Sequence, residues 1–119
     1  MDNQRVVIDQ GTIKELLSLT DDAAAAKTFL QKLIDAFKIV GDTTLPAMRA
    51  ALTEGNQLNL SRLGHRLKGT SRTIGAVNLG DLCESLEQGA KSAKSADVTS
   101  LVDAIEHGYR EALRALEKF

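Results

Sequence analysis

Residues 61–76 read SRLGHRLKGTSRTIGA, and this stretch decides the predicted fold. When it is drawn as a helix at about 100° per residue, the apolar residues in and next to it fall on one stripe. These residues are Leu60, Leu63, Leu67 and Ile74. His65 falls on the opposite side of the same helix. The stretch therefore predicts a helix with one buried face and an imidazole ring that faces solvent.

The outward face of this helix is expected to carry residues three, four and seven positions from each other, which are helical neighbours. Besides His65 these are Ser61, Lys68, Gly69 and Arg72. Gly69 is unusual, because a glycine inside a helix costs about 1 kcal/mol relative to alanine. Its missing side chain would leave room beside the ring for another surface. Lys68 is a mobile cation one turn from the ring and is suited to bind a phosphate oxygen.

Residues 55–80 contain four cations and no Asp or Glu, although the whole chain has a net charge of −1. The commonest meaning of such a stretch is a solvated helix face with one histidine. An exposed ring, a nearby ammonium and a glycine on one line favour a functional site instead. A nucleic-acid site is a further alternative, but the stretch has no aromatic residues for base stacking and the chain is not basic.

The pattern HRLKGTS at residues 65–71, with GA at 75–76 and LGDLCESLE at 79–87, resembles the histidine-containing phosphotransfer (HPt) domain of two-component phosphorelays. The resemblance implies that His65 accepts a phosphoryl group from a phosphoaspartate of a receiver domain. The phosphoryl group would then pass to the aspartate of another response-regulator receiver. The residues alone show that an exposed neutral imidazole is a good nucleophile near pH 7, because its pKa is about 6.5.

The resemblance also implies roles for individual residues. Lys68 and Gly69 would lie beside the phosphorylated ring of His65. Glu87 would hold the Nδ1 proton and leave Nε2 free to attack, or it would be a solvent-facing acid paired with a cation. Gly64, where the family usually has alanine, would add a flexible point. We expect partner contacts from residues around His65, namely Leu58, Ser61, Arg62, Arg66 and Arg72, although Arg72 could also be a plain surface charge.

The implied partners are response-regulator receiver domains and a hybrid sensor histidine kinase. The Mg²⁺ that the reaction needs would be bound by the receiver, so we expect no cofactor or metal on this chain. Two histidines and one cysteine give no metal-ligand set, and the scattered glycines form no nucleotide-binding loop. We therefore expect a monomeric phosphocarrier without an ATP site or kinase activity, and without nucleic-acid or membrane binding. A docking module that has lost phosphotransfer is the alternative, which the presence of His65, Lys68 and Gly69 disfavours.

The rest of the sequence predicts a single domain, residues 1–119, made of helices. Asp9 and residues 20–22 are cap signals for a short first helix and for a second one. The second helix has an apolar stripe that includes Ala26, Phe29 and Phe37 and continues in the same phase through residues 45–52. Gly41 and Pro46 lie between these parts, so periodicity leaves open one kinked helix or two helices. The resemblance favours one.

Three further helices are predicted: residues 57–73, a fourth with Cys83 inside its apolar stripe, and a last one after a break at residues 95–97. No segment alternates with a period of two. We expect an all-α fold, an antiparallel four-helix bundle with a short additional N-terminal helix. The sequence has no apolar leader and no run of 18 apolar residues. A single cysteine forms no internal disulfide, which fits a cytoplasmic protein.

Overall fold

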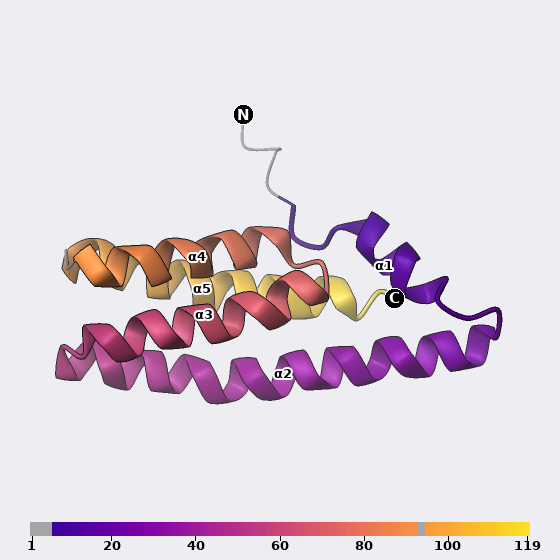
Figure 1. Cartoon of the computed structure of the whole chain (residues 1–119), viewed down its shortest axis with the longest axis horizontal. Helices are drawn as coiled ribbons and strands as arrows, with labels where there is room; N and C mark the ends of the chain where they lie inside the picture. The colour runs from indigo at the N-terminus through magenta and orange to yellow at the C-terminus, as the bar shows by residue number, and fades with distance from the viewer. Residues whose placement is uncertain (1–5, 93–94) are drawn as a thin grey trace.

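The structure is a computed structural model that describes residues 6–92 and 95–119. These residues form five helices and no strand: α1 (Gln10–Leu17), α2 (Ala23–Glu54), α3 (Gln57–Thr73), α4 (Val77–Ser92) and α5 (Ser95–Leu116). Helices α2 to α5 lie side by side as an antiparallel bundle, and α1 packs at one end of it (Figure 1). The predicted fold class is confirmed. No helix in the described part of the chain is both long and apolar enough to cross a membrane.

The helices begin and end at the capping residues. The Asp9 carboxylate accepts the backbone N–H of Thr12 at 3.0 Å, and the Asp22 carboxylate accepts two N–H groups of the first turn of α2 at 3.0 and 3.2 Å. These side chains satisfy backbone donors that have no partner within the helix. Gly55 ends α2 with φ +68°, a backbone conformation that favours glycine.

Helix α2 is one continuous helix through Gly41 and Pro46, as the resemblance favoured. Gly41 lies under the ring of Tyr109 from α5, and a Cβ at residue 41 would overlap that ring. The same ring lies 5.2 Å from the ring of Phe37, centroid to centroid, and its hydroxyl donates to the Lys38 carbonyl at 3.0 Å. Tyr109 therefore packs onto α2 beside Gly41 and Pro46, the two residues that disfavour a continuous helix. This packing stabilises α2 there.

Gly41→Ala is expected to lower the free energy of unfolding by about 1–3 kcal/mol, because overpacking forces buried side chains to shift. Helix propensity alone acts in the opposite direction by about 1 kcal/mol. Gly108→Ala is the matched control, because Gly108 is also helical and buried but its Cβ would meet the nearest atom at an ordinary 3.5 Å. Urea denaturation measures both variants. A Gly41→Ala chain as stable as the Gly108→Ala chain would contradict the packing argument.

Helix α1 and the segment before it are attached to the turn between α3 and α4. The N–H of Asp9 donates to the Gly75 carbonyl at 2.7 Å, and the N–H of Asn78 donates to the Val6 carbonyl at 2.9 Å. Gly75 has φ +83°, and a Cβ there would also lie 3.1 Å from Thr12. A residue with a side chain is strained at this position. These contacts fix the C-terminal end of α3, the helix that carries His65.

The core is mostly aliphatic and contains Cys83, whose burial raises the pKa of the thiol to about 12. Two predictions are wrong. Phe29 is 39% exposed, whereas Ala26 and Leu30 in the same stretch of α2 are buried, so the buried face of α2 does not include Phe29. Residues 95–97 are not a break, since α5 already begins at Ser95, and residues 93–94 lie outside the described part.

Candidate functional site

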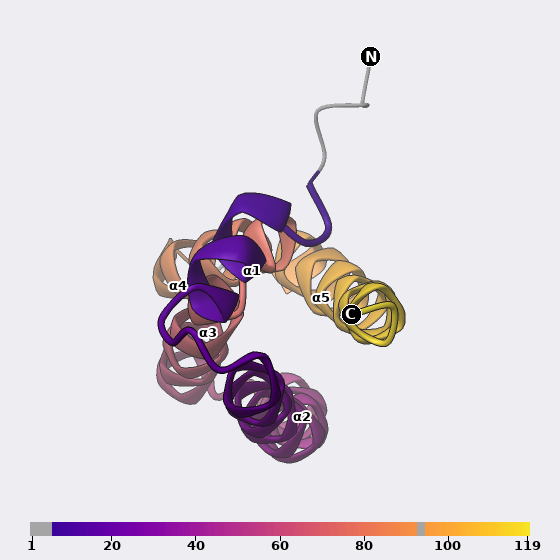
Figure 2. The ribbon, with the colours of Figure 1, turned by 90° about the vertical axis from the view of Figure 1, so that its right-hand side faces the viewer.

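The ring of His65 projects from the middle of α3 into solvent, with 69% of the side chain exposed. On the opposite face of α3, Leu60, Leu63 and Leu67 are buried. In the end view of Figure 2, α3 lies between α2 and α4. The outward placement of the ring is confirmed, and the site has one side that faces α4 and another that faces α2.

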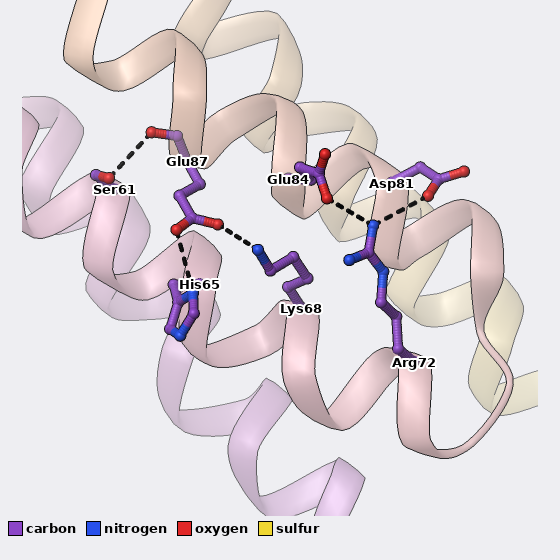
Figure 3. Close-up of polar contacts among 7 residues, drawn as sticks. All are labelled: Ser61, His65, Lys68, Arg72, Asp81, Glu84 and Glu87. Carbon is purple, nitrogen blue, oxygen red and sulfur yellow. Dashed lines mark hydrogen bonds and ion pairs between the residues drawn. The ribbon is translucent and has the colours of Figure 1, made fainter.

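On the α4 side, Glu87 contacts both His65 and Lys68 (Figure 3). Its Oε2 lies 3.1 Å from Nδ1 of His65, and its Oε1 accepts a hydrogen bond from Nζ of Lys68 at 2.7 Å. Glu87 therefore contacts both the ring and a cation, and with 15% of its side chain exposed it is not a solvent-facing acid. The hydrogen bond from Lys68 is the main reason that the pKa of Glu87 is lowered below its usual range. The group is therefore a carboxylate at neutral pH.

Four residues of α3 at helical spacing surround Glu87: Ser61, Gly64, His65 and Lys68. The Ser61 hydroxyl donates to the backbone carbonyl of Glu87 at 3.0 Å. A Cβ at Gly64 would lie 3.2 Å from the Glu87 backbone nitrogen and 2.9 Å from another backbone atom of α4. The prediction that Ser61 lies on the outward face is wrong, because α4 covers that side of α3 and leaves the residue 5% exposed. Gly64 is therefore a position where α3 packs closely against the backbone of α4, and not a flexible point.

Arg72 also extends toward α4, where it pairs with Asp81 and Glu84 at 3.3 and 2.8 Å (Figure 3). Gly80 makes room for it, since a Cβ there would lie 2.9 Å from Cγ of Arg72. Its hydrogen bond to Glu84 is the main cause of a raised pKa of the guanidinium. Arg72 is therefore not a plain surface charge, because it pairs with two acids of α4.

On the α2 side, the surface beside His65 is a groove of about 380 Å³ between α2 and α3. Its main lining residues are Leu33, Ala36 and Phe37 of α2 and Arg66, Gly69 and Thr70 of α3. Apart from its two chain neighbours and the backbone of α3, no atom lies within 4 Å of the place where a Cβ of Gly69 would be, so the predicted open space beside the ring is confirmed. Leu58, two turns before the ring, is 61% exposed, and Arg62 is also exposed.

This arrangement leaves one ring nitrogen available for chemistry. Of the two neutral tautomers, only the one with the proton on Nδ1 donates a hydrogen bond to Glu87, and this tautomer leaves Nε2 with a free electron pair. Nε2 of an exposed neutral imidazole is a competent nucleophile. Within residues 6–92 and 95–119, no group of three His, Cys, Asp or Glu side chains could hold a metal ion.

Glu87→Ala is expected to shift neutral His65 from the Nδ1–H form toward the Nε2–H form, which free imidazole side chains favour. Nitrogen-15 chemical shifts of the ring measure the ratio of the two forms directly. Glu84→Ala is the matched control, since it removes an acid one turn away that bonds to Arg72 and not to the ring. An unchanged tautomer ratio in Glu87→Ala would show that the 3.1 Å contact does not orient the ring.

Comparisons with known proteins identify the family and the fold. A family model described as "Hpt domain" matches residues 32–118. The fold is similar to the crystal structure of histidine-containing phosphotransfer protein B (HptB) from Pseudomonas aeruginosa PAO1. That match has a TM-score of 0.81 and 22% sequence identity, and it covers 93% of this chain and 91% of the other. No curated protein matches the chain.

Proposed function

The chain belongs to the Hpt domain family, the histidine phosphotransfer domains of phosphorelays, and we propose that His65 is the residue that carries the phosphoryl group. The observation that supports this proposal most is the contact between Nδ1 of the exposed ring and the carboxylate of Glu87 at 3.1 Å. It leaves Nε2 as the atom that reacts. His107, the other histidine, is also exposed, but its ring pairs with Glu111 on its own helix at 3.6 Å.

In the proposed reaction, the electron pair of Nε2 attacks the phosphorus of a phosphoaspartate on a receiver domain. The N–P bond forms while the bond from phosphorus to the aspartate oxygen breaks, and the carboxylate leaves with that electron pair. The ring then bears positive charge, with its proton on Nδ1. The Glu87 carboxylate stabilises this charge from 3.1 Å. Transfer to the next receiver is the same step in reverse.

Lys68 has two tasks in this proposal. In the resting chain its ammonium binds Oε1 of Glu87 at 2.7 Å and so holds the carboxylate in place. Its side chain is 19% exposed, and one turn of helix separates it from His65. Rotation of the flexible stem would bring the ammonium to the phosphoryl oxygens, where charge is spread in the transition state.

We propose that the partner supplies the rest of the machinery. The donor and the acceptor are aspartates of response-regulator receivers, one of them in a hybrid sensor histidine kinase. The Mg²⁺ is bound by the receiver. The chain itself is then a monomeric phosphocarrier without an ATP site, and the reaction takes place in the cytoplasm.

Incubation with receiver domains that have been phosphorylated with radiolabelled phosphate tests the proposal. Label is expected to move from a receiver to this chain, to survive base and to be lost in acid, because phosphohistidine has that stability and an acyl phosphate is lost in base. Digestion of the labelled chain is expected to place the label on the peptide that contains residue 65. A chain that binds receivers and never takes label would be a docking module, and the proposed function would be wrong.

A further inference from the structure

Helices α3 and α4 pack closely at Gly64, the residue before His65. A Cβ at residue 64 would lie 2.9 Å from the backbone oxygen of Cys83 and 3.2 Å from the backbone nitrogen of Glu87. Nonbonded heavy atoms are in ordinary contact at about 3.5 Å or more. The atoms in the way belong to the backbone of α4 and cannot rotate aside as the end of a side chain can. A side chain at residue 64 would therefore push α4 away from α3.

The hydroxyl of Ser61, one turn before His65, fixes the position of α4 along α3. It is buried and donates to the backbone carbonyl of Glu87 at 3.0 Å (Figure 3). A serine inside a helix often donates to a carbonyl one turn earlier in its own helix. Ser71 does so, with a bond of 2.7 Å to the Leu67 carbonyl. Ser61 instead uses its hydroxyl to connect two helices.

Both contacts involve the backbone of Glu87, the residue whose side chain contacts the ring. Its Oε2 lies 3.1 Å from Nδ1 of His65, whereas its Oε1 lies 2.7 Å from Nζ of Lys68. Hydrogen bonds from nitrogen to oxygen span about 2.7–3.2 Å, so the contact with the ring is near the long limit. A small increase in the separation of α3 and α4 would therefore break this contact first, because the flexible stem of Lys68 can follow the carboxylate.

We infer that Ser61 and Gly64 are positioning residues for phosphoryl transfer. They hold α4 at the distance and register at which Glu87 selects the reactive tautomer of His65. This inference rests on the proposed function and extends it to two residues that do not touch the phosphoryl group. A side chain at residue 64, or loss of the hydroxyl at residue 61, would keep both the ring and the carboxylate in the chain but move them apart.

The Gly64→Ala variant tests the distance between the helices. Nitrogen-15 chemical shifts, measured where the ring of His65 is neutral, are expected to give a tautomer ratio between those of the parent and Glu87→Ala chains. Single-turnover labelling by a phosphorylated receiver is expected to slow about tenfold, since a displacement of about 1 Å can cost on the order of 100-fold. Gly108→Ala is the control. It also adds a methyl group between packed helices, but it meets the nearest atom at 3.5 Å, so ratio and rate are expected to stay unchanged.

The Ser61→Ala variant tests the register and adds no atom to the interface. It is expected to shift the tautomer ratio in the same direction and to slow labelling about threefold, since only the contact along the helix is lost. Ser71→Ala is the matched control, because Ser71 is also a buried serine of α3 but bonds within its own helix. It is expected to change neither the ratio nor the rate.

Far-UV circular dichroism shows which variants fold, and Ser61→Ala decides alone if Gly64→Ala does not. A parent-like tautomer ratio in either folded variant would overturn the inference, and so would slower labelling without a change in the ratio. A Ser61→Ala chain that does not fold would also overturn it, because the hydroxyl would then serve the fold alone. Labelling of the parent chain is measured in parallel. Its absence would refute the proposed function, whereas a shifted ratio would still show that the two residues orient the ring.

Discussion

The His65→Gln variant is expected to take up no label from a phosphorylated receiver while it remains as stable as the parent chain. Transfer requires a nitrogen with a free electron pair, and an amide side chain does not provide one at this position. The fold is expected to tolerate the change because 69% of the His65 side chain is exposed. Exposed substitutions of this kind usually change the free energy of unfolding by less than about 0.5 kcal/mol.

His107→Gln is the matched control for this experiment. The chain has two histidines, and 67% of the His107 side chain is exposed, so both variants lose one exposed imidazole. Labelling of His107→Gln is expected to proceed at the rate of the parent chain. Label on the His65→Gln chain at a similar rate would show that another residue accepts the phosphoryl group, even though the fold is that of an Hpt domain.

Features that depend on nearby residues could be predicted from the sequence. The bounds of α3, residues 57–73, follow from a glycine and an asparagine before the helix and from the regular leucine spacing within it. The outward direction of His65 follows from the same spacing. Periodicity alone left open whether α2 continues through Gly41, and the ring that packs against Gly41 belongs to Tyr109, 68 positions later in the chain.

Features that depend on how helices face each other could not be predicted from one helix. Residues 55–80 contain no Asp or Glu, so this part of the sequence alone indicates a cluster of cations without acids to pair with them. The acids that pair with two of these cations are Asp81, Glu84 and Glu87. They lie on α4, the next helix in the chain, which runs back along α3. Ser61 lies near His65 on the helical wheel, yet α4 buries it, because the wheel does not specify where a neighbouring helix crosses.

The Gly69→Ala and Gly69→Gln variants are expected to be more stable than the parent chain and slower in transfer. Residue 69 lies inside α3, and apart from its two chain neighbours and the backbone of its own helix no atom lies within 4 Å of the place where its Cβ would be, so a Cβ there meets open space. Loss of glycine alone then raises the free energy of unfolding by up to about 1 kcal/mol. Gly108→Ala is expected to give a similar gain far from the ring, and it serves as the control for stability without a change in transfer.

Transfer is expected to slow because we propose that the rim of the receiver approaches the ring of His65 through this same space. The reacting nitrogen and phosphorus must be held in line at short range, so a displacement of about 1 Å costs on the order of 100-fold in rate. The loss is expected to grow from Ala to Gln, since the longer side chain extends further over the groove. Denaturation and single-turnover labelling measure the two effects separately. A Gly69→Gln chain that is more stable than the parent and transfers as fast would show that no close approach occurs at residue 69. Gly69 would then destabilise α3 without making phosphoryl transfer faster.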